Sequence, residues 1–245
     1  RRCFGMKTAV ITAFADNEVG KLMEDFILQG GVDTSLINWK KTDGIGRICR
    51  NGINFTERGF GIRGAVGCSD RANTAIAQAT PEDFDFDYIF GELGVRWLHT
   101  GGIYAALSEQ SCETVLAAIK AAKKLGLTVS FDPNFRSTLW SFSTARDVLS
   151  KYLPYVDVLI GIEPIHVYNP DGTDVKDGLT MDPSFKDMDR VFKAIDEQYH
   201  MKAIGRTVRY VHSGSNNSLK AFFYTNGETY ESKTINFEIV DRVGG

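Results

Sequence analysis

The strongest constraint on the fold is a unit of strand, helix and strand between residues 95 and 132. VRWLHTGG (95 to 102) and LTVSFDPN (127 to 134) are apolar runs that predict two buried strands. Between them, SEQSCETVLAAIKAAKKLG (108 to 126) has the apolar spacing of an amphipathic helix that begins at Ser108. Such a unit is the usual crossover between neighbouring parallel strands. The chain therefore predicts an α/β fold with a mostly parallel sheet.

The same alternation of short apolar runs and helical patterns continues along the chain. KTAVITAF (7 to 14) predicts a strand, and Asn17 is placed to cap a helix that ends at Gly30 and Gly31. Val19, Leu22, Met23, Phe26 and Ile27 make one apolar face of that helix. Further strands are expected at residues 155 to 162, 201 to 207 and 219 to 225, a helix at 187 to 199 and a polar surface excursion at 167 to 184.

One glycine-rich segment, residues 45 to 71, interrupts this alternation. IGRICR and INFTE flank Asn51 and Gly52, a pair that is typical of hairpin turns. The simplest interpretation is a β lid that projects from the sheet, and the alternative is a disordered loop. The chain then divides into residues 1 to 44 of an α/β core, a lid at 45 to 71, and the remainder of the core at 72 to 245.

The composition limits the classes of partner. The 28 basic and 31 acidic residues give a net charge of −3, which offers no footprint for nucleic acid or an anionic membrane. The four cysteines are far apart and match neither a zinc site nor a disulfide framework. No apolar run is long enough to span a bilayer. We therefore expect a cytoplasmic protein that binds a small molecule.

Polar residues follow several of the predicted strands, which is where such sheets bind ligands. FDPNFRSTLW places Asp132, Asn134 and Arg136 directly after one strand. A guanidinium there can hold a carboxylate or phosphate through two hydrogen bonds, although Asp132 and Arg136 could instead pair with each other. Other polar residues at predicted strand ends are Glu163, Arg206, Thr207 and Arg209.

The final residues, DRVGG (Asp241 to Gly245), follow the alternating run INFEIV. Glycines after a strand can direct backbone N–H groups at a common point and so bind an anion. Phosphoryl transfer needs such a cradle because negative charge concentrates on the transferred group. A tight turn is the alternative reading of a Gly-Gly pair.

Five segments, in this order, resemble the ribokinase-like carbohydrate kinases, also called the PfkB family, and within it the 2-keto-3-deoxygluconate kinases. They are GGVDTSLI (30 to 37), SDRANTAIAQATPEDFD (69 to 85), WLHTGGIYAAL (97 to 107), FDPNFRSTLW (131 to 140) and DRVGG. The resemblance covers essentially the whole chain. It implies the ribokinase-like fold, a central mostly parallel sheet flanked by helices, with a small β-sheet lid. It also implies that both chain ends are incomplete, because the family has a strand before the position of Lys7 and a catalytic aspartate after that of Gly245.

The resemblance implies an ATP-dependent kinase of a small sugar acid, with 2-keto-3-deoxygluconate as the first candidate. The alternatives are a kinase of a neutral sugar such as ribose or fructose, and a non-catalytic kinase-like binding or scaffold protein. ATP and Mg²⁺ would be the cofactors, together with a monovalent cation. A homodimer would be the assembly.

The resemblance also assigns roles to residues. Arg71 would meet the carboxylate of the sugar acid, and the alternative is a solvated arginine beside Asp70. Asn134 and Arg136 would lie between the sugar and the phosphates of ATP. The remaining assignments are Arg206, Thr207 and Arg209 to ATP, Glu163 to the metal, Asp241 to the sugar or the monovalent cation, and Gly244 and Gly245 to the anion hole.

Two departures from the family pattern bear on this reading. Ser69 stands where an aromatic residue often precedes the lid arginine by two positions. GIEPIHV, which contains Glu163, replaces the N-x-x-E pattern that organises metal and phosphate in many members.

Overall fold

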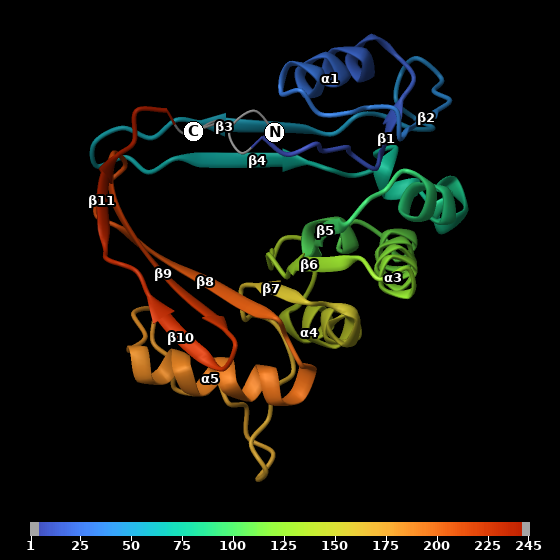
Figure 1. Ribbon diagram of the computed structural model, residues 1–245. Coiled ribbons are helices and arrows are strands. Elements are labelled where there is room, and N and C mark those ends of the chain that lie inside the picture. Colours follow the sequence, from blue (N-terminus) through green and yellow to red (C-terminus); the bar gives the residue numbers. More distant parts are fainter. Residues whose placement is uncertain (1–4, 242–245) are drawn as a thin grey trace.

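A seven-stranded sheet forms the centre of the molecule, in the order β10-β9-β8-β7-β6-β5, with β11 paired to β9 (Figure 1). The computed structural model describes residues 5 to 241. The strands are β5 (Trp97–Gly101), β6 (Thr128–Asp132), β7 (Val158–Ile160), β8 (Ala203–Val211), β9 (Asn216–Thr225), β10 (Glu228–Glu231) and β11 (Ile235–Glu238). Strands β5 to β8 are parallel, and β9 runs antiparallel to β8. The predicted crossover and parallel sheet are confirmed.

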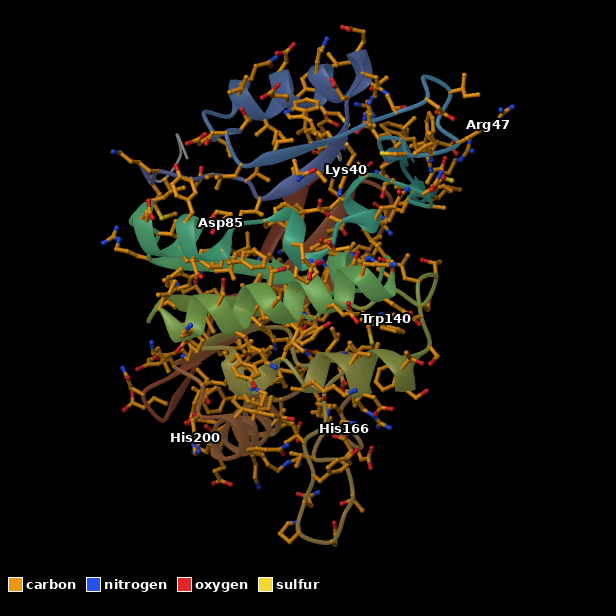
Figure 2. All side chains as sticks on the ribbon, turned by 90° about the vertical axis from the view of Figure 1, so that its right-hand side faces the viewer. Lys40, Arg47, Asp85, Trp140, His166 and His200 are labelled. Atoms are coloured by element: carbon orange, nitrogen blue, oxygen red, sulfur yellow. The ribbon has the colours of Figure 1, made fainter. Side chains whose placement is uncertain are left out.

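Helices cover this sheet, and in Figure 2 they lie one below another along one side of the molecule. They are α2 (Gly102–Ala105), α3 (Glu109–Lys124), α4 (Phe142–Ser150) and α5 (Phe185–Tyr199). The Ser108 side chain accepts a hydrogen bond from the backbone N–H of Ser111, so it caps α3 as predicted. Val115 and Ile119 of α3 are buried together with Phe131 of β6, which places the core between the helices and the sheet.

A separate sheet of two parallel strands, β1 (Thr12–Ala15) and β2 (Ile37–Lys40), lies beside α1 (Glu18–Gln29). Asn17 caps α1 by accepting from the N–H of Gly20. The apolar face predicted for this helix is largely exposed, at Val19, Leu22 and Phe26. The reason is that α1 approaches β1 through Gly20, where an added Cβ would lie 2.3 Å from the carbonyl oxygen of Ala15.

The lid is a hairpin of β3 (Ile53–Glu57) and β4 (Val66–Asp70), inside the range predicted for it. The predicted turn at Asn51 and Gly52 is wrong, because the chain turns between β3 and β4 instead. Asn51 is buried, and its side-chain oxygen accepts from the N–H of Ala15 at 2.9 Å. Its amide nitrogen donates to the carbonyl oxygen of the same residue at 3.3 Å. Asn51 therefore anchors the root of the lid to β1.

Two other expectations about strands differ from the structure. Strand β5 is not buried throughout: Trp97 and His99 alternate with the buried Leu98, so they lie on a face of the strand that is exposed. Strand β8 runs on to Val211 rather than ending near residue 207.

Short 3₁₀ and π segments complete the fold. They are η1 (Ile76–Gln78), η2 (Pro81–Asp83), η3 (Tyr88–Glu92) and η4 (Leu153–Tyr155). Among the described residues, no helix has the length and apolar character that crossing a bilayer requires.

Candidate functional site

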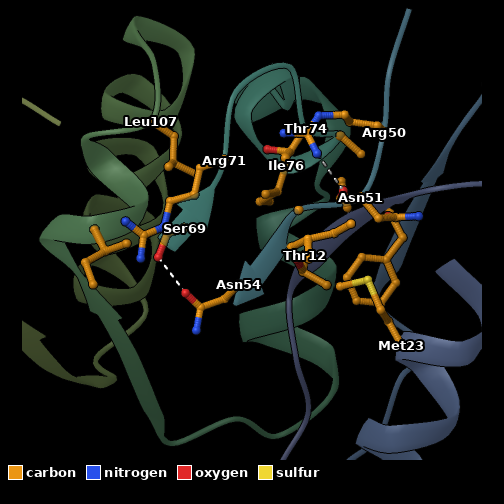
Figure 3. Close-up of a pocket in the computed structure, with 16 residues that line it drawn as sticks. Thr12, Met23, Arg50, Asn51, Asn54, Ser69, Arg71, Thr74, Ile76 and Leu107 are labelled. Carbon is orange, nitrogen blue, oxygen red and sulfur yellow. Dashed lines mark hydrogen bonds between the residues drawn. The ribbon is translucent and has the colours of Figure 1, made fainter. Parts of the chain in front are cut away.

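A pocket of about 320 Å³ lies between β1, the root of the lid and the segment that begins with α2 (Figure 3). Apolar side chains from these elements form much of its wall, among them Phe14, Ile76, Ile103 and Leu107. The polar side chains of Asn54, Ser69 and Arg71 also face it. An apolar wall with a few polar groups is the usual composition of a small-molecule site.

Arg71 is a charged group of this pocket that has no partner among the residues that the structure describes. It is partly buried and makes no hydrogen bond or ion pair with any residue between 5 and 241. Its neighbour Asp70 forms an ion pair with Arg50 instead. Asp70 is therefore not an ion-pair partner of Arg71, and the role of Arg71 in binding a carboxylate stays a prediction. A partly desolvated guanidinium favours an anionic partner, because the loss of hydration is otherwise uncompensated.

Asn54 and Ser69, which the sequence reasoning did not assign to the site, face the same pocket from the lid. They are opposite each other in the β3–β4 register, and the Ser69 hydroxyl donates to the Asn54 side-chain oxygen at 2.8 Å (Figure 3). The Asn54 amide donates to the hydroxyl of Thr56 at 3.1 Å. The alternation of polar Asn54 with apolar Ile53 and Phe55 was the signal that could have found this polar face.

The turn after β6 forms a second polar group of residues. The carboxylate of Asp132 accepts from the N–H of Asn134 at 2.9 Å, and burial raises the pKa of this carboxyl. Asn134 has φ of 38°, in the left-handed region that Asn tolerates better than most residues. Arg136 donates to the carbonyl oxygen of Phe135, and no ion pair joins it to Asp132 in the part of the chain that the structure describes. The predicted alternative of an Asp132–Arg136 pair is thus wrong.

Helix α2 lies between the turn after β6 and the pocket of Arg71. An added Cβ at Gly101 would be 2.7 Å from the Asp132 carbonyl oxygen, and one at Gly102 would be 2.0 Å from that of Pro133. The next residue, Ile103, lines the pocket. The structure therefore places Asp132 close to the pocket across α2, whereas Asn134 and Arg136 do not line it.

Glu163 lies after β7 among several charged side chains. Its Oε2 atom is enclosed and has no hydrogen-bond partner within the described chain. Burial raises the pKa of this carboxyl to about 7, and the nearby ammonium group of Lys176 opposes part of that effect. Arg206 and Arg146 lie near it as well.

These surroundings do not favour the predicted role of Glu163 as a metal ligand. Three basic side chains are near its carboxyl group, and they repel a cation. Over residues 5 to 241, no cluster of three or more His, Cys, Asp or Glu side chains could hold a metal ion. The assignment of Mg²⁺ to Glu163 is untested and stays a prediction.

The structure separates the three residues that were predicted to bind ATP after a strand. Arg206, Thr207 and Arg209 lie inside β8, not after it. Successive residues of a strand point to opposite faces, so Arg206 does not share a face with the other two. Arg206 is partly buried and contacts the sulfur of Met188 on α5, while Arg209 donates to the side-chain oxygen of Asn217. The expectation that they follow a strand is therefore wrong, whereas their assignment to ATP is untested and stays a prediction.

Of the terminal motif DRVGG, the structure describes only the first residue, Asp241. Asp241 is exposed and follows β11, whereas Gly244 and Gly245 lie outside the described residues.

The chain is similar to known kinases along most of its length. The model of the pfkB family carbohydrate kinases matches residues 3 to 165. A 2-dehydro-3-deoxygalactonokinase of Haloferax volcanii is 31% identical over 159 residues, which are 65% of this chain and 47% of the relative. The crystal structure of a 2-dehydro-3-deoxygluconokinase from Thermotoga maritima has a TM-score of 0.81 at 29% identity, and covers 98% of this chain and 69% of that one.

A more distant neighbour shares the fold. It is a ribokinase II of E. coli in complex with ATP and Mg²⁺, with a TM-score of 0.65 at 17% identity over 94% of this chain and 63% of its own. The chain spans about half the length of the curated relative from Haloferax volcanii, at 47%.

Proposed function

Because the chain belongs to the pfkB family of carbohydrate kinases, we propose that the protein transfers the γ-phosphate of ATP to a hydroxyl group of a small sugar acid. The first candidate substrate is 2-keto-3-deoxygluconate, which is the same compound as the 2-dehydro-3-deoxygluconate of the kinase from Thermotoga maritima. Catalysis in such a reaction consists mainly of positioning and of stabilising negative charge.

The observation that carries this proposal is the guanidinium of Arg71 in the pocket under the lid, which has no partner among residues 5 to 241. A carboxylate bound there would pair with it in a charge-assisted contact worth roughly 1.5 to 3 kcal/mol. A neutral sugar would leave the same guanidinium partly desolvated and unpaired. Asn54 and Ser69 on the lid offer amide and hydroxyl groups to the hydroxyl groups of the sugar.

The nucleotide is assigned to the carboxyl ends of the parallel strands. Asn134 and Arg136 follow β6 there, close to α2, and Arg206 supplies a further partly buried positive charge. When bound, Mg²⁺ would neutralise phosphate charge, and in kinases it is held largely by phosphate oxygens and water. The anion hole at Gly244 and Gly245, the monovalent cation near Asp241 and a cytoplasmic location remain predictions.

Arg71→Ala tests the carboxylate contact. We expect KM for 2-keto-3-deoxygluconate to rise about 10- to 100-fold, as the loss of a charge-assisted contact implies. KM for a neutral sugar such as fructose or ribose should change little. Arg47→Ala is the matched control, because Arg47 is an exposed arginine near the lid that does not line the pocket (Figure 2). Equal changes for acid and neutral sugars would contradict the proposal.

We also propose a homodimer that buries the outer face of the lid. Phe55 and Val66 lie on the face opposite Asn54 and Ser69, with exposed fractions of 64% and 59%. Large exposed apolar side chains gathered on one sheet face are typical of an interface. A second copy of the lid presents the same face and can bury it symmetrically.

A further inference from the structure

The tip of the lid is bound to a turn that lies about 150 residues further along the chain. The backbone N–H of Gly214, in the turn between β8 and β9, donates to the carbonyl oxygen of Gly61 at 2.6 Å. The N–H of Gly61 donates to the hydroxyl of Ser215 at 3.2 Å. In Figure 1 the lid extends from β1 and β2 at one side of the molecule to the end of β8, β9 and β11 at the other.

The tip of the lid and the turn between β8 and β9 approach each other so closely that position 214 in the turn requires glycine. A Cβ added at Gly214 would lie 2.3 Å from the carbonyl oxygen of Arg63 and 2.9 Å from that of Gly61. Both obstructing atoms belong to the backbone, so no side-chain rotation can relieve the overlap. The backbone of Gly214 is not in the left-handed region, so alanine is excluded there by the lid and not by its own conformation.

The turn that receives the lid is itself fixed from the other side. The N–H of Asn216 donates to the hydroxyl of Ser213 at 2.9 Å, and the N–H of Ile239, after β11, donates to the carbonyl oxygen of Ser215 at 2.7 Å. The turn therefore has a defined position before the lid meets it. The root of the lid is fixed as well, through the hydrogen bonds between the Asn51 side chain and the backbone of Ala15 in β1.

We infer that the turn Ser213–Gly214–Ser215 is a positioning element for substrate binding: it holds the lid closed by its tip, and so keeps the pocket face of the lid over the sugar. Asn54 and Ser69 lie between the two fixed ends of the lid, and Arg71 follows directly after β4. A hairpin fixed only at its root can swing away from the pocket. The second attachment removes that freedom, and Gly214 is the residue on which it depends. This inference rests on the proposed function for its consequence in catalysis, but not for the attachment itself.

Gly214→Ala is the direct test, with Gly64→Ala as the matched control. A Cβ at Gly64 would meet nothing within 4 Å, although Gly64 belongs to the same tip. Hydrogen–deuterium exchange of the lid amides, residues 53 to 70, is measured on the intact protein. Losing both tip contacts should speed exchange there by about tenfold or more in Gly214→Ala. Exchange in Gly64→Ala should match the unsubstituted protein. Equal lid exchange in all three proteins would overturn the inference.

Ser215→Ala provides a second variant in case Gly214→Ala fails to fold. It removes the acceptor of the Gly61 N–H, and it should speed lid exchange about threefold to tenfold while β6 and α3 keep their protection. No change in lid exchange would again overturn the attachment.

Kinetics then test the positioning role. In Gly214→Ala, KM for 2-keto-3-deoxygluconate should rise about fivefold to twentyfold, with a smaller change in KM for ATP, because only the sugar lies under the lid. A looser lid with an unchanged KM for the sugar acid would refute the positioning role. If the unsubstituted protein does not bind a sugar acid, the proposed function fails, while the exchange result still decides the attachment.

Discussion

The burial of Glu163 among charged side chains after β7 can be tested through the pH dependence of the free energy of unfolding. The substitution is Glu163→Gln, which keeps the size of the side chain and removes its titration. Burial raises the pKa of Glu163 from 4.5 to about 7 in the folded protein. Between these two pH values the folded state therefore binds a proton that the unfolded state has released. Stability from this group is thus greatest at low pH and is lost as the pH rises through about 7.

The magnitude follows from the same two values. One pKa unit corresponds to about 1.4 kcal/mol. The difference between 4.5 and about 7 thus gives an upper limit of about 3 kcal/mol. Solvent reaches part of this side chain, so screening reduces the expected effect to about 1 to 2 kcal/mol. The groups that face Glu163 are Lys176 and Asp174 from the excursion, Arg206 from β8 and Arg146 from α4.

The assay is urea unfolding at pH 5 and pH 8 for the unsubstituted protein and for Glu163→Gln. Relative to the unsubstituted protein, Glu163→Gln should gain about 1 to 2 kcal/mol between pH 5 and pH 8. Glu113→Gln, at an exposed glutamate of α3, is the control and should show no such gain. Other titrating groups cancel because each comparison is made at the same pH. If the stability difference between Glu163→Gln and the unsubstituted protein is the same at both pH values, the assigned burial of Glu163 is refuted.

Two further predictions concern the root and the outer face of the lid. Asn51→Ala should destabilise the protein by about 2 kcal/mol in urea unfolding, because the buried N–H of Ala15 loses the side-chain oxygen that accepts from it, while the carbonyl oxygen of Ala15 keeps only the N–H of Asn17. Gln110→Ala, at an exposed amide of α3, is its control, and an equal loss in both would contradict the anchoring role. Phe55→Asp should shift the proposed dimer to monomer in size-exclusion chromatography with light scattering, whereas Met181→Asp, exposed but off the lid, should not. A monomer before substitution would disprove the dimer.

Local sequence patterns were enough to predict the strands and helices at the centre of the fold, but not the contacts between residues far apart in the sequence. The crossover from β5 through α3 to β6 could be predicted because apolar spacing and the Ser108 cap are properties of neighbouring residues. The turn at Asn51 could not, because its side chain is committed to Ala15, which is 36 residues away. The end of β8 was misplaced for a similar reason. The strand continues through polar residues to Val211 because β9 pairs with it over its whole length.

The candidate site shows the same division. Arg71 was found through the resemblance to sugar kinases. The structure adds that its guanidinium lines the pocket and has no partner among the described residues, which favours the binding of an anion. The alternation within β3 could have indicated a polar face at Asn54, but that Ser69 shares this face depends on the register of β3 and β4, which the sequence of one strand does not give. Arg206 and Arg209 were assigned to ATP as residues that follow a strand, whereas both lie inside β8, whose alternation places them on opposite faces.

The attachment of the lid tip also has a consequence for the order in which the protein matures on the ribosome. Gly61 and Ser215 are 154 residues apart, so the lid leaves the ribosome long before the turn that holds it. During that interval the tip of the hairpin has no place to dock, and the apolar outer face is open to chaperones and to other nascent chains. The tip of the lid can be held only after β9 has paired with β8, which makes the closed candidate site one of the last features of this chain to form.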